Sequence, residues 1–89
     1  MDPDADLDTA MLRGLRHFRQ LSDRDANWPR ALPVWSIAED LGVSADEAEA
    51  AADRLAWAGL AEVTKPRMGF GPMARATDVA MALPEAPHA

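Results

Sequence analysis

The sequence predicts a mainly α-helical domain with a small β-hairpin towards its carboxyl end. Two patterns carry this prediction. Apolar residues recur at helical spacing before residue 59, between recognisable start and stop signals. Beyond residue 59, apolar and polar residues alternate on both sides of a segment rich in proline and glycine, which is typical of two paired strands and their turn. The 89 residues suffice for one small domain with a thin core.

Composition and missing motifs exclude several function classes. No segment has the ~20 consecutive apolar residues of a membrane span. The acidic amino end lacks the pattern of a signal peptide, so we expect a cytoplasmic protein without membrane contacts. There is no cysteine, and His17 and His88 are far apart in the chain, which leaves no thiolate or paired-histidine chemistry. Catalytic and nucleotide-binding motifs are also absent, so the sequence predicts no enzyme activity, no metal and no cofactor.

The first helix is predicted over residues 7–22. Its apolar residues follow spacings of four, four and three, which place them on one buried stripe: Leu7, Met11, Leu15 and Phe18. Residues 1–6 form a predicted acidic tail, and its aspartates interact favourably with the positive, amino-terminal end of the helix dipole. The polar segment 22–33 is predicted to be a loop that ends in a short edge strand at 30–32. Trp28 and Trp35 are expected to close one side of the core, with Trp28 the more exposed of the two.

Local signals define two further helices and the turn between them. A helix over residues 33–41 is predicted to begin at a proline, which suits a first turn, and to stop at Gly42. Ser44 and Glu47 form a predicted capping box, which starts a helix that runs to about residue 58. The buried face of this helix is narrow and made of small residues, which permits a close approach to the preceding helix: Ala48, Ala52, Leu55 and Gly59.

The rest of the chain is predicted to form a hairpin and a last short helix. Residues 60–64 and 73–77 have the alternation of antiparallel strands, and 65–72 form the predicted tip between them. Thr77 or Asp78 can cap a helix over 79–83, which Pro84 ends. Residues 84–89 are predicted to be a disordered tail. The predicted domain therefore spans residues 7–83.

Three sequence segments, in this order, resemble one known family. They are IAEDLGVS at 37–44, RLAWAGLA at 54–61 and ATDVAMAL at 76–83. These segments are similar to parts of the winged helix-turn-helix domains of small bacterial regulators of the MarR, PadR and ArsR type. Segment 37–44 corresponds to the second helix with its turn, and segment 54–61 to the end of the third helix with the first wing strand. Segment 76–83 corresponds to the second wing strand with the last helix. Ala80 stands where a glycine is common in that family. The resemblance implies a three-helix core plus a wing.

The resemblance also implies a transcriptional regulator that binds double-stranded DNA and forms a homodimer. In this family the third helix enters the major groove, and the wing contacts the backbone or an adjacent minor groove. Carried over to this chain, the DNA-binding residues are Ser44, Ala45, Glu49, Arg54, Lys65, Arg67 and Arg75. Lys65 and Arg67 lie at the predicted hairpin tip and are the best candidates for phosphate contacts. A charged tip is equally typical of a hairpin that is only solvated.

The charge of the third helix points to a different function. Residues 36–62 carry seven acidic residues and one arginine, within a chain of net charge −6. Asp46, Glu49 and Asp53 would face a polyanion, whereas DNA affinity comes largely from cations that neutralise phosphates. The alternative prediction is a winged-helix module that binds a protein and not DNA, with Trp57, Asp46 and Asp53 as its contact surface. A simply solvated acidic helix face is the third interpretation.

Trp57 is central to the protein-binding alternative. At ~100° per residue, it projects away from the buried stripe and towards the side of Asp46 and Asp53. The indole either folds beneath the hairpin near Phe70 or stays exposed and anchors a partner or a second copy, since tryptophan is enriched among interface hot spots. In a homodimer, the basic surface expected to cover it is the side of the first helix formed by Arg13, Arg16 and Arg19.

Overall fold

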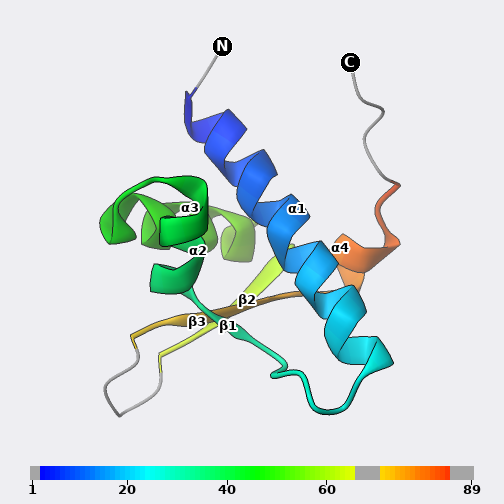
Figure 1. Ribbon diagram of the computed structural model, residues 1–89. Coiled ribbons are helices and arrows are strands. Elements are labelled where there is room, and N and C mark those ends of the chain that lie inside the picture. Colours follow the sequence, from blue (N-terminus) through cyan, green and yellow to red (C-terminus); the bar gives the residue numbers. More distant parts are fainter. Residues whose placement is uncertain (1–2, 66–70, 85–89) are drawn as a thin grey trace.

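The computed structural model of the chain describes residues 3–65 and 71–84. It is mainly helical, with a small antiparallel sheet, as the sequence predicts. The elements in chain order are α1 (Pro3–Arg24), β1 (Leu32–Pro33), α2 (Val34–Leu41), α3 (Ala45–Trp57), β2 (Ala61–Thr64), β3 (Met73–Ala76) and α4 (Asp78–Ala82). Helices α2 and α3 lie on one side of α1 and α4 on the other, and β3 runs behind α1 towards α4 (Figure 1). Among the described residues, no helix is both long and apolar enough to cross a bilayer.

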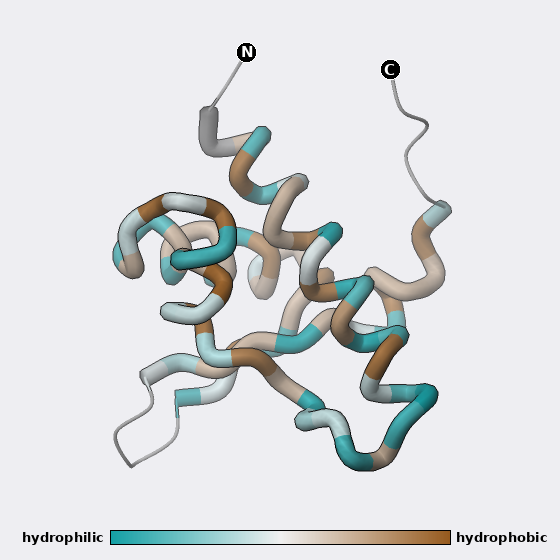
Figure 2. The backbone as a smooth tube through the Cα atoms, in the orientation of Figure 1, coloured by the Kyte–Doolittle hydropathy of each residue, from teal (hydrophilic) through white to brown (hydrophobic). Residues whose placement is uncertain are grey.

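Helix α1 begins earlier and ends later than the predicted 7–22. It starts at Pro3, so residues 3–6 of the predicted tail belong to its first turns, and it continues to Arg24. Proline suits a helix start because its missing N–H would have no partner there. The centre of the predicted stripe is confirmed, since Met11 and Leu15 are 0% and 1% exposed. Figure 2 shows apolar stretches, in brown, alternating with polar ones along α1, as expected of a helix with one apolar side.

Trp28 in the loop after α1 and Trp35 in the first turn of α2 are both about half exposed. Trp28 packs edge-on against Phe18, with ring centroids 5.9 Å apart. Trp28 is nevertheless 44% exposed and Trp35 49% exposed, so neither closes the core as expected. The expected ranking is also wrong, because Trp35 is not the better buried of the two. The contact of Trp28 with Phe18 joins residues ten apart in the chain, so no local pattern in the loop reveals it.

The turn between α2 and α3 forms as its local signals predict. Helix α2 ends at Leu41, and Gly42 follows it with a left-handed φ of 70°. The Gly42 N–H donates to carbonyl oxygens of the last helical turn. The capping box is confirmed: the backbone N–H of Glu47 donates to Ser44 Oγ at 3.1 Å, and that of Ser44 donates to Glu47 Oε1 at 3.4 Å. One boundary differs from the prediction. Pro33 pairs with β3 as part of β1 and precedes α2, which starts at Val34.

The sheet has the strand order β1-β3-β2, with β3 in the middle. The predicted hairpin is confirmed at its base, where Ala61 pairs with Ala76 and Thr64 with Met73. Residues 66–70 of its predicted tip, which include Arg67 and Phe70, lie outside the described residues. Thr77 caps α4 by accepting from the Ala80 N–H at 3.2 Å. Its hydroxyl also donates to the Gly59 carbonyl oxygen at 2.7 Å, which ties the end of the sheet to the end of α3.

The core between the helices and the sheet is built largely from alanine. Its large, fully buried side chains are Met11, Leu15 and Val34. The remaining buried hydrophobic residues are Ile37, Ala38, Ala48, Ala51, Ala52, Leu55, Ala61, Ala74, Ala76 and Ala80. Small side chains on α3 and on the inner face of β2 and β3 let these elements approach closely. The consequence for function is that α3 is fixed firmly on one side and fully exposed on the other.

Candidate interaction surface on the third helix

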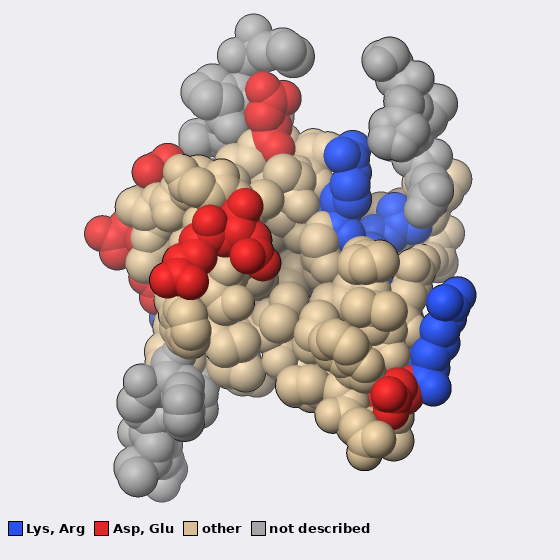
Figure 3. All heavy atoms as spheres, in the orientation of Figure 1, with Lys and Arg blue, Asp and Glu red and all other residues tan. Residues whose placement is uncertain are grey.

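The exposed side of α3 carries acidic residues and one tryptophan at helical spacing. Asp46, Ala50, Asp53 and Trp57 follow one another at intervals of four, three and four residues and are all exposed. Such intervals place side chains on one face of a helix. Glu49, partly buried, borders the same side. We call these five residues the acidic face. Figure 3 shows acidic side chains gathered over α2 and α3, whereas the basic ones in that view lie towards α1 and α4.

Trp57 is almost completely accessible, with 92% of its surface exposed. The expectation that it folds beneath the hairpin is therefore wrong. The physical reason is the direction of the last helical turn. Leu55 takes the buried position in that turn, and two residues further on the side chain points to the opposite side of the helix, at ~100° per residue. The indole stands at the end of the acidic face, free of the core.

Arg54 is not on the acidic face. Its Nε donates to Asp8 Oδ1 and Oδ2 at 3.1 and 3.0 Å, and its Nη2 donates to Asp8 Oδ1 at 2.8 Å. The two side chains are 39% and 25% exposed. This charge-assisted contact through two guanidinium nitrogens ties α3 to α1. A guanidinium held this way would have to give up an internal partner before it could bind a phosphate.

Of the remaining expected DNA-binding cations, the two that the structure describes, Lys65 and Arg75, line different hollows. Lys65 lines a hollow of about 210 Å³ between α3 and the loop end of strands β2 and β3, together with Glu49 and Asp53. Two carboxylates therefore stand beside this single lysine. Arg75 pairs with Glu62 across β2 and β3, with Nε and Oε2 3.6 Å apart. Arg67 lies outside the described residues.

Ser44 and Ala45, also expected at a DNA contact, start α3 and are exposed. The hydroxyl of Ser44 is already engaged, since it accepts from the Glu47 N–H and donates to Glu47 Oε1 at 3.0 Å. Its role in this structure is to cap the helix. A ligand at this position would compete with that cap.

The basic side of α1, expected to cover Trp57 in a homodimer, is largely used within the chain. Arg16 Nη2 donates to the Leu83 carbonyl oxygen at 2.8 Å. Arg19 donates to the Ala76 carbonyl oxygen at 3.0 Å and to the Asp78 carboxylate. The hydrogen bond and the charge of Arg19 hold the pKa of Asp78 below its usual value. These partners are distant in sequence, so helical spacing alone could not reveal that the arginines bind α4 and β3.

Among the described residues, no group of three or more histidine, cysteine, aspartate or glutamate side chains is arranged to hold a metal ion. Comparison with protein-family models, with curated proteins and with solved structures finds no match for this chain. The arrangement of the exposed side chains on this chain is thus the basis for any functional proposal.

Proposed function

We propose that the chain is a winged helix-turn-helix domain that binds a protein partner through the acidic face of α3. The element order and the strand order β1-β3-β2, with the hairpin between β2 and β3 as the wing, support this fold. They agree with the order of the sequence segments that resemble the family. Function does not follow from a fold alone, so the exposed residues must carry the rest of the argument.

The observation that carries the proposal is the 92% exposure of Trp57 at the end of an acidic helix face. A tryptophan offers a large apolar surface together with one N–H donor, and it is among the residues enriched at interface hot spots. Asp46 and Asp53, on the same side of α3, would attract a basic surface and fix its orientation. The partner is therefore expected to present arginine or lysine side chains around an apolar recess that receives the indole.

A second copy of the chain fits this description poorly. The chain has a net charge of −6, so two copies repel at long range. Of the three arginines expected to supply the basic surface, Arg16 and Arg19 already bind Leu83, Ala76 and Asp78, which leaves Arg13 as the one without a partner among the described residues. A different protein with a basic surface is the better partner.

Double-stranded DNA is the second candidate, favoured by the wing and by the exposed Lys65, which directly follows β2 at the loop end of the wing. The charges beside that lysine weaken the case. Asp46, Glu49 and Asp53 would approach phosphates at an energetic cost, whereas DNA binding depends on releasing counterions from neutralised phosphates. For this reason we place DNA after the protein partner.

Site-specific photo-crosslinking in cells of the source organism tests the proposal. A photoreactive amino acid at position 57 is expected to give discrete protein adducts, and the same group at Val79, which is 59% exposed on α4, is the matched control. The adducts should fade when Asp46 and Asp53 are both changed to asparagine. Thermal melts establish that each variant folds, since Trp57 has little contact to lose.

Three results would contradict the proposal. They are an absence of adducts at position 57, the same adducts from position 79, and adducts that persist after both aspartates are neutralised. Adducts to DNA in place of protein would instead favour the second candidate.

A further inference from the structure

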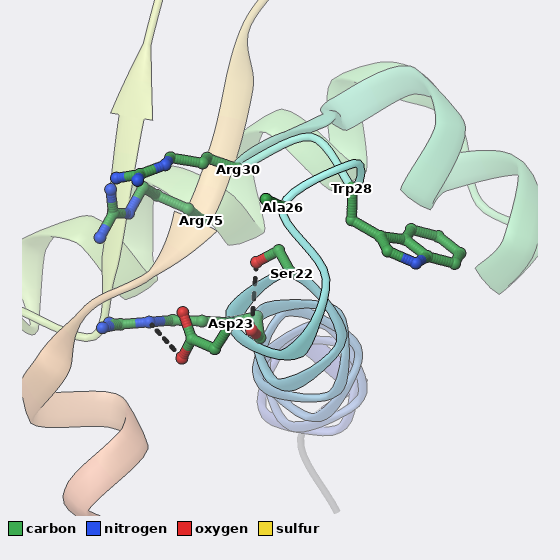
Figure 4. Close-up of a pocket in the computed structure, with 7 residues that line it drawn as sticks. Ser22, Asp23, Ala26, Trp28, Arg30 and Arg75 are labelled. Atoms are coloured by element: carbon green, nitrogen blue, oxygen red, sulfur yellow. Dashed lines mark hydrogen bonds and ion pairs between the residues drawn. The ribbon is translucent and has the colours of Figure 1, made fainter.

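A second surface of the molecule contains a hollow lined by three arginines, which we call the arginine pocket. Its volume is about 330 Å³, and it is lined by Arg19, Arg30 and Arg75 together with Ser22, Asp23, Ala26 and Trp28. The arginines come from α1, from the loop before β1 and from β3. In Figure 4 the side chains of Arg30 and Arg75 extend in the same direction, with Asp23 and the end of α1 beneath them. This hollow is separate from the acidic face.

The charges in the arginine pocket are not balanced by the residues that line it. Three guanidinium groups face one carboxylate, that of Asp23, which lies 3.7 Å from Arg19 Nε. Glu62 and Asp78 pair with Arg75 and Arg19 but do not line the hollow. The residues that line the hollow therefore carry three positive charges and one negative charge, while Glu62 and Asp78 offset Arg75 and Arg19 from outside it.

Two of the three arginines keep donors available. Arg30 is exposed and makes no hydrogen bond or ion pair within the part of the chain that the structure describes. Arg75 Nε is buried without a hydrogen-bond partner, and Glu62 Oε2 is beyond hydrogen-bond distance at 3.6 Å. A buried donor without a partner is unfavourable, so an acceptor at this point would be stabilising. Arg19, in contrast, already donates to Ala76 and Asp78, and it contributes mainly charge.

We propose that the arginine pocket binds the phosphate group of a small molecule. Guanidinium groups present planar pairs of donors that match the oxygens of a phosphate, and such charge-assisted hydrogen bonds are strong. The volume far exceeds the ~10–15 Å³ that holds one water, so it has room for a phosphate with a compact polar body. Trp28 also lines the pocket, but its ring is turned away from the arginines in Figure 4 and packs edge-on against Phe18.

Titration of the full chain with inorganic phosphate, at constant ionic strength in chloride, tests this proposal. We expect saturable shifts of the arginine Nε–H resonances of Arg30 and Arg75 and a rise in Tm with phosphate. Arg30→Ala should weaken phosphate binding about tenfold, because it removes a charge-assisted contact. Arg30 has no partner among the described residues, so this variant should fold normally.

Arg24→Ala is the matched control, since Arg24 is an exposed arginine in the last turn of α1 that does not line the pocket. It should leave phosphate affinity within about twofold of wild type, because screening weakens the effect of distant charges. Glycerol 3-phosphate should compete with inorganic phosphate at the same resonances. The proposal is overturned if millimolar phosphate shifts none of them, if Arg24→Ala weakens binding as much as Arg30→Ala, or if duplex DNA competes and glycerol 3-phosphate does not.

Discussion

Removing the charge of Asp8 should destabilise the protein by detaching α3 from α1. In Asp8→Asn, Arg54 loses an ionic partner that it contacts at 2.8–3.1 Å through two nitrogens. A fully exposed pair would contribute little, but these side chains are only 39% and 25% exposed. Hydrogen bonds to charged groups at such partly buried positions stabilise by about 1–2 kcal/mol. For a domain of this size, that loss lowers Tm by roughly 4–15 °C.

Thermal melts of Asp8→Asn and Asp6→Asn measure this contribution. Asp6 is an exposed carboxylate in the same part of α1, so its variant has the same change in net charge and nearly the same position relative to the helix dipole. Asp6→Asn should change the free energy of unfolding by less than about 0.5 kcal/mol. Equal losses in the two variants would mean that the charge near the helix start matters and the contact with Arg54 does not. That result would refute the stabilisation that we assign to the contact between Asp8 and Arg54.

Two further predictions concern the loss of stability at low pH and the binding of double-stranded DNA. Because Arg19 lowers the pKa of Asp78 in the folded state, the stabilisation is complete above the usual aspartate value of 3.8 and is lost as the pH falls through the lowered pKa. Urea melts below about pH 4 should therefore show a shallower loss of stability in Asp78→Asn than in wild type, and parallel curves would contradict this. For DNA, we expect no binding of wild type to mixed duplex DNA at ~50 mM salt. If binding occurs and Lys65→Ala with Arg67→Ala lowers its salt slope by about one to two units, DNA becomes the leading candidate.

Local signals predicted much of the fold because they act within a few residues of one another. The contacts between Ser44 and Glu47 and the left-handed Gly42 form inside a single turn of chain, so the boundary between α2 and α3 could be placed from sequence. The alternating residues of the hairpin likewise specify β2 and β3. The start of α1 was placed too late because apolar spacing begins at Leu7, whereas helix geometry is already favourable at Pro3.

The candidate site was less predictable, because the partners of its arginines lie far away in the sequence and only the fold brings them together. Helical geometry placed Trp57 on the outside of α3, but only the structure could decide whether the hairpin covers it. Arg54 belongs to the same helix, and its partner Asp8 is 46 residues away. No sequence pattern marks Arg30 as a site residue, because a lone arginine in a polar loop does not reveal the pocket that it shares with Arg75.

The alanine-rich core also determines how the protein responds to temperature. The heat-capacity change on unfolding grows with the apolar area that unfolding exposes. Eight of the thirteen buried core residues are alanines, such as Ala48 and Ala74, and each hides little apolar area. The stability curve of this domain should therefore be flatter than that of a domain of equal length built on leucine and phenylalanine. When the free energy of unfolding is small and changes little with temperature, the thermal transition is broad. A bound partner or anion then raises the folded population over a wide range of temperature.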